Sequence, residues 1–202
     1  GKTTTIKMLT TLLAPTSGVC KVFGCDTFGQ EKQIRKRINF IFGGEMGVYR
    51  RLSGRDNLRY FANLYLMDTA ERESRINEIL ELVELTDAAD RLAETYSKGM
   101  TQRLQIARGL INDPEIIFMD EPTVGLDPLG AHMLRGIIRK LRDDGKTVLL
   151  TTHYLPEAEE LCDRIVILNH GEIVARGTPE EIKGDSATLE EAYISLIKGD
   201  VQ

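Results

Sequence analysis

The 202-residue sequence contains no tryptophan, and it has only three cysteines and three histidines. The cysteines at positions 20, 25 and 162 are odd in number and form no C-x-x-C pair, and the histidines are scattered at 132, 153 and 170. This spacing argues against a zinc site or a disulfide scaffold. It favours reduced thiols, as in the cytosol.

An excess of basic residues and a long apolar run are also missing. Lys and Arg number 26 against 31 Asp and Glu, which gives a net charge of −5. Proteins that bind nucleic acid usually present a basic face, so we expect no nucleic-acid partner. No apolar run approaches the ~20 residues of a membrane-spanning helix. With 42% hydrophobic and 28% charged residues, the composition is that of a globular protein with one sizeable core.

The chain begins with GKTTTIKMLT, without an initiator methionine. Gly1-Lys2-Thr3 matches the end of the phosphate-binding loop G-x-x-x-x-G-K-[ST], although such a triplet also occurs by chance. Apolar residues at 6, 9, 12 and 13 predict a helix after it, ended by Pro15 and Gly18. Because the earlier glycines and a preceding strand are missing, we expect the sequence to be truncated within this loop.

Strands and helices alternate over much of the chain. The predicted strands are 19–24, 38–44, 115–120, 147–153 and 164–170, and the helices between them include 30–37, 129–143 and 155–161. Near-continuous apolar strands separated by helices are typical of a parallel sheet covered on both faces. Near the C-terminus, NHGEIVARG predicts a hairpin turning at Gly171, and 178–181 and 188–191 predict capping boxes.

A long stretch in the middle of the chain has helical periodicity only. It runs from 54 to about 93, and a further helix is expected after Ser97. We therefore predict an α/β fold, formed by a single domain over 1–202. A helical subdomain of about 50–112 is inserted into a sheet core built from the remainder.

The segment IIFMDEPTVGLDP at 116–128 carries the most chemical information. Its strand ends in Asp120, which places a carboxylate at the edge of the sheet where α/β proteins bind ligands. In phosphate-loop ATPases such an aspartate holds Mg²⁺, and Glu121 is well placed to polarise an attacking water. A salt-bridged acidic pair is the alternative for a bare Asp-Glu, but the Pro-Thr and Gly-Leu-Asp-Pro that follow argue against it.

A second candidate site is TYSKGMTQRLQIARGL at 95–110. Ser97 is expected to begin a helix and is followed by Lys98 and Gly99. A helix N-terminus with a hydroxyl and a glycine forms an anion site, and a plain serine N-cap is the alternative. The 115–120 strand follows this helix closely, so we expect the two elements to lie near each other.

These motifs, in this order, resemble the nucleotide-binding domain of an ATP-binding cassette (ABC) transporter over essentially all 202 residues. The resemblance implies a P-loop NTPase fold with a RecA-like parallel sheet core and an inserted helical subdomain. It implies ATP hydrolysis with Mg²⁺ as cofactor. ATP would bind between two such domains arranged head to tail, as a homodimer.

Site residues follow from the resemblance by position. Gly1 to Thr4 match the end of the Walker A loop, in which Lys2 would contact the β- and γ-phosphates, Thr3 would ligate Mg²⁺ and Thr4 would contact the α-phosphate. Ser97 and Gly99 lie in the segment matching the family signature and would contact the nucleotide of the second domain.

The remaining matches lie in the second half of the chain. Residues 116–120 match Walker B, with Asp120 as the Mg²⁺ ligand and Glu121 as the catalytic glutamate. Asp127 lies in the D-loop and would contribute to nucleotide binding. His153 matches the switch histidine that reaches the γ-phosphate, although a lone histidine at a strand end is more often structural.

The sequence departs from the family pattern at two places. Lys98 and Met100 replace the usual glycine and glutamine of the signature. A glutamine that senses Mg²⁺ and the membrane partner is missing after 38–44, where Gly44 and Glu45 stand instead. Glu45 would substitute as an oxygen ligand for the metal, or the role is lost.

The resemblance implies an ATPase subunit at the inner face of the plasma membrane, on the cytoplasmic side of a separate permease. The segment around 43–93 is its expected docking face, and its sequence is most similar to ABC-2 exporters of drugs, antibiotics or polysaccharide and lipid. The alternatives are a non-transport ABC ATPase acting on ribosomes or DNA, and a nucleotide-gated module that no longer hydrolyses ATP.

Overall fold

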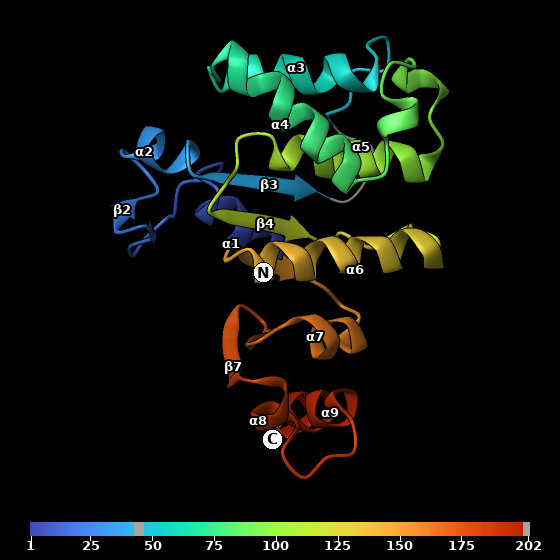
Figure 1. The fold of residues 1–202 in the computed structure, drawn as a ribbon. Helices are drawn as coiled ribbons and strands as arrows, with labels where there is room; N and C mark the ends of the chain where they lie inside the picture. The colour runs from blue at the N-terminus through green and yellow to red at the C-terminus, as the bar shows by residue number, and fades with distance from the viewer. Residues whose placement is uncertain (43–46, 200–202) are drawn as a thin grey trace. The chain divides into compact units, whose positions relative to one another are not determined.

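The computed structural model describes residues 1–42 and 47–199 (Figure 1). The chain divides into two compact units. The larger is Ile6–Leu150, and the smaller combines Gly1–Thr5 with Thr151–Gln202. Gly44 and Glu45, for which the sequence predicts a metal-sensing role, lie outside the described residues.

A parallel sheet forms the centre of the larger unit. Its strands β3 (Ile38–Phe42), β4 (Ile116–Asp120) and β5 (Thr147–Thr151) follow each other in that order. β3 and β4 are parallel, and Phe42 lies opposite Asp120 at their carboxyl ends. The predicted α/β class is therefore confirmed, with Asp120 at the sheet edge where α/β folds bind ligands.

The first part of the larger unit packs beneath this sheet. Helix α1 (Lys2–Leu9) and helix α2 (Glu31–Arg35) flank a short hairpin of β1 (Lys21–Val22) and β2 (Cys25–Asp26). Their shared core consists of fully or almost fully buried side chains: Ile6, Val22, Ile34, Ile38 and Phe118.

The single strand predicted at 19–24 is wrong, because the structure forms two strands of two residues each around a tight turn. Phe23 and Gly24 both have positive φ, at 54° and 75°. A two-residue turn with this backbone joins antiparallel strands directly. The alternating pattern alone did not show that the chain reverses at Phe23.

Three helices follow one another between β3 and β4, as predicted. They are α3 (Gly54–Leu64), α4 (Thr69–Leu82) and α5 (Lys98–Leu110), with short 3₁₀ turns at Thr86–Ala88 and Ala93–Thr95. Each begins with an N-cap side chain that accepts a hydrogen bond from a backbone amide of the first turn: Ser53, Asp68 and Ser97.

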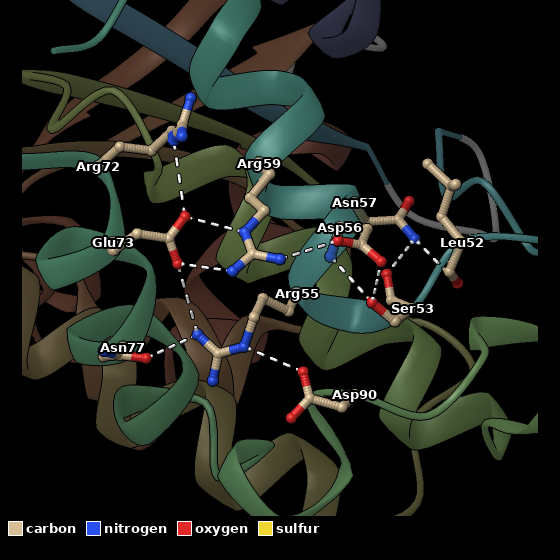
Figure 2. A network of polar contacts seen from close by, with 10 residues as sticks. All are labelled: Leu52, Ser53, Arg55, Asp56, Asn57, Arg59, Arg72, Glu73, Asn77 and Asp90. Carbon is tan, nitrogen blue, oxygen red and sulfur yellow. Dashed lines mark hydrogen bonds and ion pairs between the residues drawn. The ribbon is translucent and has the colours of Figure 1, made fainter. Parts of the chain in front are cut away.

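Ion pairs join α3 to α4 (Figure 2). Arg59 donates two hydrogen bonds to the carboxylate of Glu73, at 2.8 and 3.0 Å, and a third to Asp56 at 3.1 Å. One turn earlier, Arg55 donates to Asn77 at 2.7 Å and to Asp90 at 3.1 Å. Bidentate pairing fixes both partners, so this network sets the angle between the two helices.

Helix α5 packs closely on the sheet because it carries a glycine at the contact. A Cβ atom added to Gly109 would lie 2.5 Å from Cγ1 of Ile41 on β3. Helix α6 (Pro128–Asp143) follows β4, and its buried side chains recur at helical spacing: Leu134, Ile137, Ile138 and Leu141.

The smaller unit contains α7 (Leu155–Leu161), β6 (Ile165–Asn169), β7 (Glu172–Gly177), α8 (Pro179–Lys183) and α9 (Leu189–Gly199). β6 and β7 form the predicted antiparallel hairpin, and its turn uses His170 and Gly171, both at positive φ. The capping box at Thr178 is confirmed. At Thr188 only one of the two hydrogen bonds of a capping box forms, from Glu191 N to Thr188 Oγ1. The Glu191 side chain accepts from Ala187 N instead of Thr188 N.

Within residues 1–42 and 47–199, none of the helices combines the length and the apolar character needed to cross a bilayer.

Candidate functional site

Glu121 has an unusual backbone conformation at the end of β4. Its φ is +50°, in the left-handed region that residues with a side chain rarely adopt. The peptide then turns, and Val124 N donates to the carbonyl of Glu121 at 3.2 Å. Strained backbone of this kind concentrates at functional sites. The sequence predicted the importance of Glu121 but not its conformation.

The loop after Glu121 leads into α6 through a second turn. Leu126 N donates to the carbonyl of Thr123 at 3.1 Å, and Gly125 between them has a φ of +79°. Asp127 is the N-cap of α6, and its Oδ1 accepts a hydrogen bond from Gly130 N at 2.7 Å. One carboxylate oxygen of Asp127 therefore caps a helix; its predicted contact with a nucleotide stays a prediction.

Ser97 occupies the start of α5 as the sequence predicts. Its Oγ accepts a hydrogen bond from Met100 N at 3.2 Å, which makes it an N-cap. The first turn of α5 contains no acidic residue, and Ser97 is exposed. The cap fixes where the helix begins. The other backbone amides of the first turn can still donate hydrogen bonds to an anion.

The start of α5 lies against the loop that follows β4. Gln102, which is buried, approaches the carbonyl of Pro122 with its Nε2 at 3.5 Å. A Cβ atom added to Gly125 would lie 3.0 Å from Nζ of Lys98. The expected proximity of the signature helix to the 115–120 strand is confirmed by these contacts with the loop that leaves it.

The smaller unit holds the other predicted site residues. Helix α1 begins at Lys2, immediately after Gly1, and Thr5 N donates to the carbonyl of Gly1 at 3.0 Å. His153 is exposed between β5 and α7. The structure thus gathers the predicted site residues in two groups: Ser97, Gly99, Asp120, Glu121 and Asp127 in the larger unit, and Gly1, Lys2, Thr3, Thr4 and His153 in the smaller.

The chemistry of these side chains suits a nucleotide with Mg²⁺. Lys2 offers a positive charge for phosphate, and the backbone amides at the start of α1 offer hydrogen-bond donors. The first turn of α1 contains no acidic residue that would repel an anion. Thr3 and Asp120 offer the oxygen ligands that Mg²⁺ prefers. Asp120 is only partly buried at the strand end, which leaves its carboxylate within reach of a ligand.

An aromatic cluster is formed by helix α3 and the residues just before it. The rings of Tyr49 and Tyr60 are 4.7 Å apart in an edge-to-face arrangement, and those of Tyr60 and Phe61 are 5.3 Å apart. The tyrosines are open to solvent, with 46% of Tyr49 and 39% of Tyr60 exposed. We name Tyr49, Tyr60, Phe61 and Tyr65 the aromatic face.

Arg108 of α5 supports this face from behind. Its guanidinium lies 5.1 Å from the ring centroid of Phe61 and donates to the carbonyl of Gly47 at 3.3 Å. Burial lowers the pKa of Arg108. Gly47 has a φ of +94°, which disfavours any side chain, and a Cβ atom there would displace the guanidinium. The sequence did not predict this role, because 61 residues separate Arg108 from Gly47.

Asn57 fixes the position of Tyr49. The backbone N of Tyr49 donates to Oδ1 of Asn57 at 2.8 Å, and Nδ2 of Asn57 donates to the Tyr49 carbonyl at 3.0 Å. The same Nδ2 donates to the carbonyl of Ser53 at 2.8 Å (Figure 2). A buried amide with this many partners holds its surroundings in one arrangement, so the aromatic face is built on a fixed support.

A parallel sheet with Asp120 and Glu121 at the end of β4 is the arrangement expected of a P-loop ATPase domain. A family model described as "ABC transporter" matches residues 1–124, so the chain belongs to the ABC transporter family. Over 198 residues it is 38% identical to the ABC transporter ATP-binding protein NatA of Bacillus subtilis, covering 98% of the chain and 80% of that relative.

Other relatives are longer. The chain is 44% identical over 183 residues to the daunorubicin/doxorubicin resistance ATP-binding protein DrrA of Streptomyces peucetius, covering 91% of the chain and 55% of that protein. It thus spans about half the length of this relative. A solved structure titled "Structure of ATP binding subunit of ABC transporter" superimposes with a TM-score of 0.84 at 33% identity, covering 98% of this chain and 83% of that one.

These relatives establish the class of activity. ATP-binding proteins of ABC transporters are ATPases, and the chain is an ATP-binding domain of that family. Its relatives are of the DrrA and NatA type.

Proposed function

We propose that the chain is the ATP-hydrolysing part of an ABC exporter and powers a membrane permease from the cytoplasmic face. The observation that carries this is the Asp120-Glu121 pair at the carboxyl end of β4, with the start of α5 beside the loop that follows it. The names of relatives support the export of drugs: one is a "Fluoroquinolones export ATP-binding protein" of Mycobacterium tuberculosis, 43% identical over 184 residues.

Phosphate binding is proposed for the start of α1. Lys2 contributes an ammonium for the β- and γ-phosphates, Thr4 a donor for the α-phosphate, and Gly1 a backbone without side chain close to them. Thr3 and Asp120 hold Mg²⁺ by their oxygens. An ion held there would supply positive charge to neutralise the terminal phosphates. In phosphoryl transfer, positioning and charge neutralisation provide most of the catalysis.

Glu121 is proposed to orient and polarise the attacking water. Its left-handed backbone turns the chain sharply at the end of β4, so its carboxylate need not follow the alternation of the strand. His153 is proposed to contact the γ-phosphate. Its exposure on a short connection between β5 and α7 is compatible with that role.

A second copy of the chain is proposed to complete each site. Ser97 and Gly99 at the start of α5 would supply donors to the nucleotide held by the other copy. Ser97 is exposed in the single chain, although its hydroxyl is used as a cap. Hydrolysis would then depend on the dimer, and dimer closure would transmit the force.

The permease is proposed to dock on the aromatic face. Exposed tyrosines supported by a fixed frame are typical of protein interfaces, in which Tyr and Arg are enriched. The hydrogen bonds between Arg59 of α3 and Glu73 of α4 would help these two helices move together when a displacement is transmitted. Docking there would place the protein peripherally on the inner face of the plasma membrane.

The test uses the full-length protein with its permease in lipid vesicles, measuring ATP binding and phosphate release. We expect Glu121→Gln to keep ATP binding and to lose most hydrolysis, because an amide cannot accept the proton of water. Glu180→Gln, an exposed residue of α8, is the control and should hydrolyse normally. Normal hydrolysis by Glu121→Gln, or stable copurification with ribosomes in place of a permease, would contradict the proposal.

A further inference from the structure

Lys98 lies between two parts of the proposed site. It is the first residue of α5, directly after Ser97, and its side chain reaches to the loop after β4. A Cβ atom added to Gly125 would lie 3.0 Å from Nζ and 3.6 Å from Cε of Lys98. The ammonium therefore rests over the backbone of Gly125, between the signature helix and the D-loop.

A lysine at this position does not help α5 to form. The N-terminus of a helix carries partial positive charge, so a cation there is unfavourable and an acid is favourable. The first turn of α5 contains no acidic residue that would offset Lys98. Helix stability therefore does not explain the residue.

The ammonium of Lys98 is also without a counterion in the described part of the chain. No carboxylate lies within ion-pair distance of its Nζ there, although ion pairs are frequent on α3 and α4 nearby in sequence. Lys98 is exposed. The loop leaves room for it, since Gly125 has no side chain and a φ of +79° that disfavours one.

We infer that Lys98 acts across the dimer, presenting its ammonium to the terminal phosphate of the nucleotide bound by the second copy. This inference rests on the proposed function, which directs Ser97 and Gly99 to that same phosphate. Lys98 adds a full charge to the uncharged donors beside it, and Gly125 supports its side chain in the single chain. The charge would stabilise negative charge that builds up on the phosphate oxygens during transfer.

Single substitutions in the full-length protein test the role of the charge. We expect Lys98→Met to lower kcat/KM for ATP by about 10- to 100-fold, the size of one charge-assisted contact. Lys98→Arg should restore most of the loss, because arginine also brings a positive charge and N–H donors that pair with phosphate. Lys32→Met, an exposed lysine on α2, is the control and should leave the kinetics unchanged. A loss that Arg does not restore would contradict the inference.

Mixed dimers separate action across the dimer from action within one chain. Lys2→Ala is expected to prevent ATP binding by the chain that carries it. In a dimer of Lys98→Met with Lys2→Ala, the bound nucleotide faces an intact Lys98 of the other copy and hydrolysis should persist. The second dimer pairs a wild-type chain with a chain that carries both Lys2→Ala and Lys98→Met. Here the wild-type chain binds the nucleotide, which faces the methionine of the other chain, and hydrolysis should fall.

The reverse pattern would show that Lys98 acts on its own chain and would overturn the inference. Failure of the proposed function gives a different result, because neither Lys2→Ala nor Glu121→Gln would then change phosphate release. If those two variants are inactive while Lys98→Met hydrolyses ATP as the wild type does, the proposed function survives and the role of Lys98 is wrong.

Discussion

At the scale of the residue, the backbone of Glu121 combines a cost in stability with a position at the candidate site. The left-handed conformation is disfavoured for side chains with a Cβ by roughly 1–2 kcal/mol. Its φ of +50° follows directly after the last residue of β4. The proposed role of the Glu121 carboxylate in hydrolysis would explain why a glycine does not stand there.

Substitutions at Glu121 should therefore separate stability from activity. We expect Glu121→Gly to unfold at no lower temperature than the wild type, because the relief of strain offsets the greater freedom of glycine in the unfolded chain. Glu121→Val should be less stable by about 1 kcal/mol or more, because a β-branched residue tolerates positive φ poorly. Both should lose hydrolysis. Thermal unfolding of the full-length protein measures the relative stability of the variants. Equal unfolding temperatures for the Gly and Val variants would contradict the claim that the backbone at Glu121 is strained.

The sequence predicted where individual residues stand in the helices and strands well, and their local geometry only partly. Asp120 and Ser97 are where the pattern placed them, at a strand end and at a helix N-terminus. The helix cap formed by Asp127 was not predicted, since any Asp before a Pro fits several turns. The support of Phe61 by Arg108 depends on tertiary packing, which periodicity does not contain.

At the scale of the element, the approach of α5 to β3 depends on Gly109. We expect Gly109→Ala to destabilise the protein by about 1–3 kcal/mol, because its Cβ would collide with Ile41 in a packed core. Gly136→Ala in α6 is the matched control, since a Cβ there meets no atom within 4 Å. It should stabilise the protein by roughly 0.5–1 kcal/mol. Urea unfolding measures both, and a stabilising effect at position 109 would contradict the close contact.

The bridge between α3 and α4 should weaken in acid. Arg59 lowers the pKa of the Glu73 carboxyl below its ordinary value of 4.5. The stabilisation of the folded state by the Arg59–Glu73 pair is therefore fully present above pH 4.5. It is lost as the pH falls through the lowered pKa of Glu73. We expect Glu73→Gln to cost about 0.2–1 kcal/mol at pH 7, as for partly exposed pairs, and progressively less below pH 4.5.

Glu94→Gln is the control for this pair, because Glu94 is an exposed acid of the 3₁₀ turn at Ala93–Thr95 in the same unit. Its unfolding free energy should match that of the wild type at both pH values. A difference between wild type and Glu73→Gln that stays constant through the acid range would show that the charge of Glu73 contributes nothing.

Elements were easier to predict than their ends and pairings. The helices at 54–64, 98–110, 128–143 and 155–161 follow from apolar spacing and caps. The hairpin at 21–26 was missed, because the positive φ of Phe23 is not visible in an alternating pattern. Which strands pair in the sheet depends on contacts distant in sequence, such as Ile38 with Ile116.

At the scale of the whole molecule, we propose that a permease docks on the aromatic face. We expect Tyr60→Ala to reduce binding to vesicles that contain the permease by about tenfold or more, as for a residue central to an interface. ATP binding should not change. Phe28→Ala is the control, because Phe28 is 71% exposed and lies outside the aromatic face. Equal losses for both variants would place the permease elsewhere.

The central claim is that each ATP is hydrolysed by residues of two copies, and mixing inactive variants tests it most directly. Lys2→Ala and Ser97→Ala should each be inactive alone in the full-length protein with its permease. Mixed with each other, they form dimers in which one nucleotide meets an intact Lys2 on its own chain and an intact Ser97 on the other. The account predicts recovered phosphate release from the mixture. A mixture as inactive as its two components would contradict it.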